Sequence, residues 1–82
     1  MSVVTIRLFA AARAAAGTAE VTVPAGPVSE VLGRLAEGRS ARFAEVLSVS
    51  SLMADGTRID PGSDSPLAAG AVVDVLPPFA GG

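Results

Sequence analysis

The last two residues, Gly81 and Gly82, are the part of the sequence whose chemistry is easiest to define. Glycine has no side chain, so this segment can thread a channel too narrow for other residues and present a bare α-carboxylate. An α-carboxylate is ionised at neutral pH and is a poor acyl donor. Adenylation by a partner enzyme that uses ATP would create a good leaving group, and a sulfur nucleophile could then form a thiocarboxylate. The alternative is that the two glycines are only a frayed chain end.

The side chains offer little chemistry of their own. The sequence has no cysteine, histidine or lysine, which removes disulfides, thiol nucleophiles, imidazole bases, the usual zinc ligands and Schiff bases. It contains no phosphate-binding glycine loop, metalloprotease motif or nucleophile elbow, and its eight acidic residues are scattered. We therefore predict no side-chain catalytic site, no metal site and no bound cofactor, with ATP used only by the partner adenylating enzyme.

Length and composition indicate one small domain. The chain has 82 residues, of which 50% are hydrophobic and only three are aromatic, so the core must consist of Val, Leu, Ile and Ala. The net charge of −2 argues against nucleic-acid binding, which needs concentrated Lys and Arg. No apolar run approaches the roughly 20 residues that span a bilayer, and the N-terminus lacks a signal peptide. We expect a cytoplasmic protein without membrane contact.

Two apolar segments, residues 4–9 and 71–76, alternate with period 2 and are predicted strands. They are the most apolar of the predicted strands, so we expect them side by side and parallel in the middle of the sheet. Their core-facing residues are predicted to be Val4, Ile6, Leu8, Val73 and Val75.

The main helix is predicted to begin at Pro27 and to end at Gly38. Its apolar residues recur at i, i+3, i+4 and i+7 on one stripe, namely Val28, Val31, Leu32 and Leu35. On its other side Glu30 and Arg34 form an i, i+4 pair. Shorter helices are predicted over residues 10–17 and 39–47, and further strands over 20–23, 49–54 and 57–59. The whole is an α+β fold, a mixed sheet packed on one main helix with a flexible C-terminal Gly-Gly tail.

Several residues are candidates for a docking surface outside the core. Phe9 shares a strand face with Arg7, and an aromatic side chain there is either incidental or part of a docking patch. Leu76 also faces outward, and Arg7 and Arg58 are either solvating charges or the rim of a docking face. Pro77 and Pro78 forbid further strand pairing and stiffen the exit of the tail.

The opening Leu8-Phe9-Ala10-Ala11-Ala12-Arg13 and the ending Leu76-Pro77-Pro78-Phe79-Ala80-Gly81-Gly82 resemble those of the ubiquitin-like β-grasp sulfur carriers of the molybdopterin and thiazole type. Within that family the chain is similar to the small subunits of molybdopterin synthase. The resemblance covers essentially the whole sequence. It implies a β-grasp domain over residues 1–76 and a tail over residues 77–82 that carries the activated glycine.

The resemblance also implies a cycle and its partners. Gly82 would be adenylated by an enzyme of the ubiquitin-activating type and thiocarboxylated by a sulfurtransferase step, and Gly81 would allow the tail to pass through a channel. The tail would enter the large synthase subunit, in a heterotetramer, and donate sulfur to cyclic pyranopterin monophosphate for molybdenum cofactor biosynthesis. The chain would then be a non-catalytic, sulfur-donating subunit. The resemblance implies that Phe9, Leu76 and Phe79 belong to an apolar surface that both partners share. Together with these three, the predicted partner-binding residues are Arg7, Arg58, Pro77, Pro78 and Ala80.

Three alternatives stay open from the sequence. The chain could be a sulfur carrier for thiazole or cysteine biosynthesis, with the same chemistry at Gly82 and another acceptor. It could be a ubiquitin-like modifier joined through Gly82 to a lysine of a target protein. It could also be a binding module with an inert tail.

Overall fold

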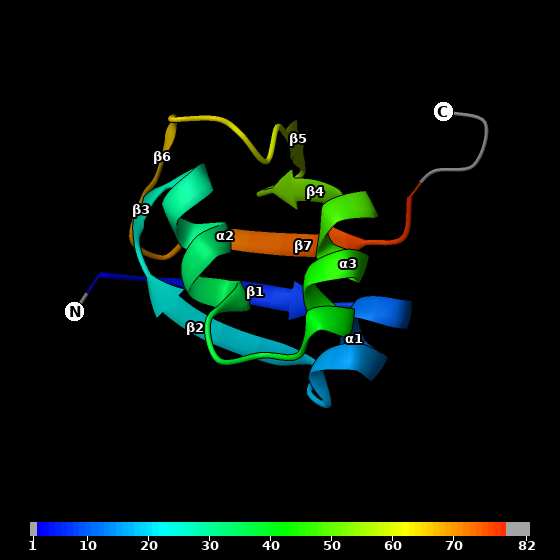
Figure 1. The fold of residues 1–82 in the computed structure, drawn as a ribbon. Coiled ribbons are helices and arrows are strands. Elements are labelled where there is room, and N and C mark those ends of the chain that lie inside the picture. The colour runs from blue at the N-terminus through cyan, green and yellow to red at the C-terminus, as the bar shows by residue number, and fades with distance from the viewer. Residues whose placement is uncertain (1, 79–82) are drawn as a thin grey trace.

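The computed structural model describes residues 2–78, which form a five-stranded sheet, a two-stranded sheet and three helices (Figure 1). The strands are β1 (Val3–Leu8), β2 (Glu20–Pro24), β3 (Gly26–Pro27), β4 (Ser51–Ala54), β5 (Thr57–Ile59), β6 (Pro66–Leu67) and β7 (Val72–Leu76). The helices are α1 (Ala10–Ala16), α2 (Val28–Ala36) and α3 (Ala41–Val49).

The main sheet is mixed, with strand order β2-β1-β7-β4-β5. Strands β1 and β7 are parallel neighbours at its centre, with Leu8 opposite Val75, and the other pairs in this sheet are antiparallel. The predicted fold class and the central parallel pair are both confirmed. Strands β1 and β7 come from distant parts of the chain, so their pairing joins the two hairpins β1–β2 and β4–β5 into one sheet.

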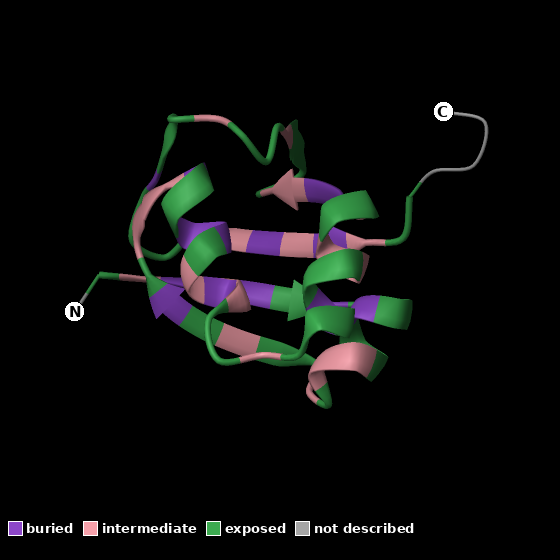
Figure 2. Cartoon of the chain, in the orientation of Figure 1, coloured by how far each residue is buried: buried purple, intermediate pink, exposed green. Residues whose placement is uncertain are grey.

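The hydrophobic core lies between one face of this sheet and the helices. The predicted core residues of β1 and β7 are all at most 1% exposed: Val4, Ile6, Leu8, Val73 and Val75. Buried and less buried residues alternate along both strands in Figure 2. The alternating residues of β1 and β7 that point the other way are exposed or half-buried, because no described element covers that face. We call it the outer face.

The two longer helices close the core from the other side. The predicted stripe of α2 is buried, and Arg34 Nη2 donates to Glu30 Oε1 at 3.4 Å on its solvent side. Helix α3 begins where Ser40 Oγ accepts the N–H of Phe43 at 3.2 Å, an N-cap hydrogen bond. Phe43 is fully buried and fixes α3 on the core.

The structure differs from the sequence predictions at three places. Helix α2 begins at Val28, because Pro27 belongs to the two-residue strand β3, which pairs with β6. A strand of two residues is too short to show, in the sequence, the alternation of apolar and polar residues that predicts a strand. Helix α2 also ends at Ala36, two residues before Gly38. Residues up to Val49 continue α3, so the strand predicted over 49–54 begins only at Ser51. Packing of Phe43 on the core outweighs the strand preference of the β-branched Val49.

Within residues 2–78 the helices are all too short, or not apolar enough, to cross a membrane.

We expect Phe43→Ala to lower the free energy of unfolding by about 3–5 kcal/mol, because it leaves a cavity in a small aliphatic core. Val49→Ala is the matched control on the same helix, since Val49 is 61% exposed; its effect should stay within about 0.5 kcal/mol. Urea unfolding followed by circular dichroism measures both. Equal effects would show that α3 does not pack as described.

Candidate functional site

The outer face carries an apolar pair where β1 and β7 end. The Phe9 N–H donates to the Val75 carbonyl at 3.2 Å, which extends the β1–β7 ladder by one residue and brings Phe9 beside Leu76. Phe9 is 38% exposed and Leu76 is half-buried. The prediction that both point away from the core is confirmed, and the structure places them next to each other.

An ion pair with two hydrogen bonds lies beside Phe9 and Leu76. Arg7 Nε and Nη2 donate to Asp74 Oδ1 and Oδ2 at 2.6 and 2.9 Å, and the Arg7 guanidinium lies 5.9 Å from the centre of the Phe9 ring. The hydrogen bond and the charge of Asp74 raise the pKa of Arg7 above its usual value, and Glu20, its cross-strand neighbour, adds to the effect. Arg7 therefore stays charged, neutralises Asp74 and lies over the Phe9 ring in a cation–π contact.

Ala10, directly after Phe9, has a backbone conformation that alanine rarely adopts. Its φ is 49°, in the left-handed region that costs a residue with a Cβ about 1–2 kcal/mol. The turn lets the Phe9 carbonyl accept the N–H groups of Ala12 and Arg13, at 3.1 and 3.3 Å, at the start of α1. Phe9 thus ends a strand and begins a helix, which fixes its backbone on both sides.

The chain leaves the sheet beside this patch. Strand β7 ends at Leu76, opposite Ser51 on β4, and Pro77 and Pro78 follow, both exposed. The predicted site residues Phe79, Ala80, Gly81 and Gly82 lie outside the described residues, so their roles stay predictions.

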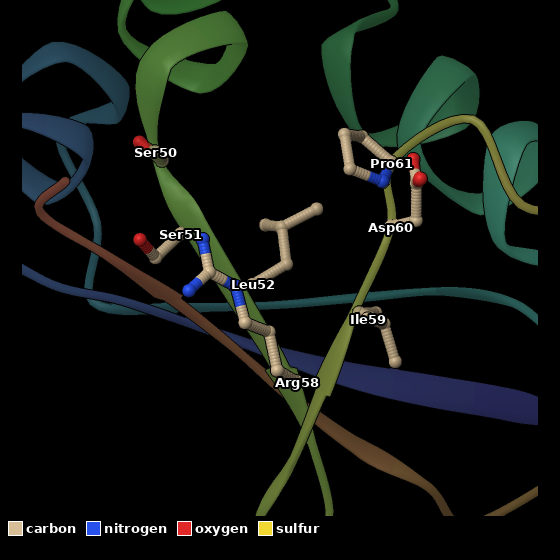
Figure 3. Close-up of a pocket in the computed structure, with 7 residues that line it drawn as sticks. All are labelled: Ser50, Ser51, Leu52, Arg58, Ile59, Asp60 and Pro61. Atoms are coloured by element: carbon tan, nitrogen blue, oxygen red, sulfur yellow. The ribbon is translucent and has the colours of Figure 1, made fainter. Parts of the chain in front are cut away.

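Arg58 lies on the same face, but on the edge strand β5. It pairs with Met53, which in turn lies opposite Asp74. It lines a cavity of about 460 Å³ at the open end of the β4–β5 hairpin, together with Ser50, Ser51, Leu52, Ile59, Asp60 and Pro61. In Figure 3 its side chain extends along the hairpin toward Ser51. The structure therefore brings Arg7, Phe9 and Leu76 into one patch and leaves Arg58 two strands away from Asp74.

Across residues 2–78 no three metal-ligating side chains gather at one point. What the described residues offer is a surface: an apolar pair and a neutralised ion pair where β7 ends, and Arg58 on the edge strand of the same face. The sequence did not indicate the roles of Asp74 and Ala10, since the Arg7–Asp74 contact spans 67 positions and alanine in a helical run gives no sign of a left-handed residue.

A model of the ThiS family matches residues 6–82. The chain belongs to the ThiS family. The match confirms the resemblance to the ubiquitin-like sulfur-carrier family that the two terminal motifs indicated. No curated protein sequence matches the chain significantly.

Solved structures agree with the ThiS assignment. Small archaeal modifier protein 1 from Methanosarcina acetivorans is 26% identical, with a TM-score of 0.80 over 100% of this chain and 98% of that one. Its counterpart from Haloferax volcanii is 22% identical, with a TM-score of 0.78 over 98% and 99%. A chain in the complex of subunits 1 and 2 of the molybdopterin-converting factor from Helicobacter pylori is 24% identical, with a TM-score of 0.68 over 98% and 99%. At 22% and 24% identity, the Haloferax volcanii and Helicobacter pylori structures show that the fold is shared.

We expect Ala10→Gly to raise the free energy of unfolding by about 0.5–1 kcal/mol, because glycine adopts the left-handed conformation without steric cost. Ala14→Gly is the matched control: Ala14 is exposed inside α1, where the same change should destabilise by about 0.5–1 kcal/mol. Denaturant unfolding of both variants tests the sign. Destabilisation by Ala10→Gly would contradict the conformation described for Ala10.

Proposed function

We propose that this ThiS-family chain is a sulfur carrier whose C-terminal Gly82 is adenylated and then thiocarboxylated. It would donate sulfur to cyclic pyranopterin monophosphate as the small subunit of molybdopterin synthase. The observation that carries the proposal is the family match, which extends to residue 82 and so includes the Gly81-Gly82 ending. The fold supports it, because the exposed Pro77 and Pro78 follow the last strand beside the Phe9–Leu76 pair.

The chemistry needs no reactive side chain from this protein. A Gly82 carboxylate oxygen attacks the α-phosphorus of ATP bound by the partner enzyme, pyrophosphate leaves, and an acyl-adenylate remains. Hydrosulfide then attacks the carbonyl carbon and displaces AMP, so that a C–S bond replaces the C–O bond. The chain contributes a slender acyl group and a surface that the partners bind. Because activation consumes ATP, we propose that it acts in the cytoplasm.

The proposed partners are an adenylating enzyme of the ubiquitin-activating type and the large subunit of molybdopterin synthase, in a heterotetramer of two small and two large subunits. The Helicobacter pylori complex of subunits 1 and 2 supports the second partner. Both partners would cover the outer face, where Phe9 offers the most exposed aromatic surface of the described residues. Arg7, Leu76, Pro77 and Pro78 would surround that contact, with Phe79 and Ala80 following into the partner.

A protein modifier is the second candidate, favoured by the 26% identity with small archaeal modifier protein 1 over the whole chain. Conjugation would use the same activated Gly82, with a target lysine as nucleophile in place of sulfur. Denaturing gels of cell extracts separate the two: conjugates persist after reduction, whereas a carrier gives none. For a thiazole or cysteine pathway, the chain would co-purify with enzymes of those pathways and not with the large synthase subunit.

We expect the chain to gain about 16 Da when it is incubated with the adenylating enzyme, ATP and a sulfur source, since sulfur replaces one carboxyl oxygen. Intact-mass spectrometry measures the gain. Deleting Gly82 should abolish it, and Gly82→Ala should slow it, because the added methyl group obstructs a narrow channel. Gly33→Ala is the matched control: Gly33 is exposed on α2 with open space around its Cβ position, so this variant should load like the wild type. Normal loading of the deletion variant would refute the assignment of Gly82.

A further inference from the structure

The arginines differ in how far their charges are compensated. Arg7 pairs with Asp74. Arg34 pairs with Glu30 and donates to the carbonyls of Pro24 and Ala25. The guanidinium of Arg39 donates to the Leu35 carbonyl at 3.0 Å and lies over the ring of Phe43. In the described part of the chain, Arg58 is the one arginine on the outer face without an ion pair.

Asp74 shares the outer face with Arg58 and Asp60 shares its cavity, but neither forms an ion pair with it within residues 2–78. Asp74 lies beyond Met53 on the same row of the sheet, and both of its oxygens bind Arg7. Asp60 lines the same cavity, but its Oδ1 accepts the Gly62 N–H at 2.9 Å, and no ion pair joins it to Arg58 within residues 2–78. The planar guanidinium therefore keeps its donors available for an outside carboxylate, which it can bind with two parallel hydrogen bonds.

The cavity beside Arg58 is close to the tail exit. Ser51, which lines it, pairs directly with Leu76, the last residue of β7. Figure 3 shows the Arg58 side chain extending toward Ser51, on the other side of the hairpin from Leu52 and Ile59. A protein that covers Phe9 and Leu76 and receives the tail must therefore also approach this cavity. Docking would remove water from the guanidinium. Binding is then weakened if the partner has no carboxylate opposite Arg58, and a partner that has one is favoured.

We propose that Arg58 is a partner-recognition residue, which pairs with an acidic side chain of the large synthase subunit that receives the tail. The inference rests on the proposed function, because the partner is the tail-binding protein. It adds a second type of contact to the docking surface. Phe9 and Leu76 supply apolar area that any tail-binding partner can use, whereas Arg58 discriminates in favour of a partner with a carboxylate at this position.

Binding to the large subunit of molybdopterin synthase, measured by isothermal titration calorimetry, tests the proposal. Arg58→Glu should weaken binding by about 10- to 100-fold, and Arg58→Gln by less, because the glutamate also repels the partner carboxylate. Arg42→Glu is the matched control, with the same charge change at an exposed position of α3 in the helical layer; it should change affinity less than about twofold. Thermal unfolding of all three variants should match the wild type, since both arginines are exposed.

The outcomes are distinct. No binding by the wild type would refute the proposed function, and this inference with it. Wild-type binding that Arg58→Glu leaves unchanged, or weakens only as much as Arg42→Glu does, would overturn the inference and leave the proposed function standing. The free chain supplies a further test: converting its C-terminal carboxylate to an amide should not move the Arg58 Nε–Hε NMR signal. A shift would mean that the chain's own carboxylate occupies the guanidinium, and it would also overturn the proposal.

Discussion

The parallel pairing of β1 with β7 is the constraint on which the rest of the structure depends. With Leu8 opposite Val75, the two strands end at the same edge of the sheet, and the residues that follow each of them meet there. If either strand shifted by one residue, its outward side chain, Phe9 or Leu76, would turn into the core and its core residues would reach the surface, because side chains alternate along a strand. Burial of Ile6, Leu8, Val73 and Val75 prevents that shift. The packing of the core thus decides which side chains surround the tail.

The outer face has no covering layer among the described residues, so it must stay hydrated while it keeps enough apolar area to bind a partner protein. Here the charges at its centre are satisfied internally, since Arg7 and Asp74 use their hydrogen bonds on each other. Such a pair can be covered by a partner at a lower cost in desolvation than separate charges would require. The exposed aromatic ring lies over the compensated arginine, so apolar contact and charge compensation occupy the same small area.

The parts of the fold that could be predicted from the sequence depend on patterns within single elements. The alternation in β1 and β7 and the stripe of α2 are long enough to show their periods, and the Asp55-Gly56 hairpin follows from the turn preference of these residues, with φ of 48° and 84°. The β3–β6 pair, two residues on each side, is too short to show a period. The Arg7–Asp74 pair depends on tertiary structure, and so does the left-handed Ala10. For the candidate site, the sequence indicated which residues face outward, whereas their neighbours across the sheet followed only from the register.

Strand β7 lies between β1 and β4 although it is the last of the described strands along the chain. Before it is in place, β1 and β4 each expose an unpaired edge, and the two hairpins have no backbone contact with each other through the main sheet. On the ribosome, the domain therefore cannot complete its sheet until the C-terminal strand has emerged from the exit tunnel. A truncated product that lacks β7 would be left with two open strand edges, the kind of surface that chaperones bind and proteases degrade.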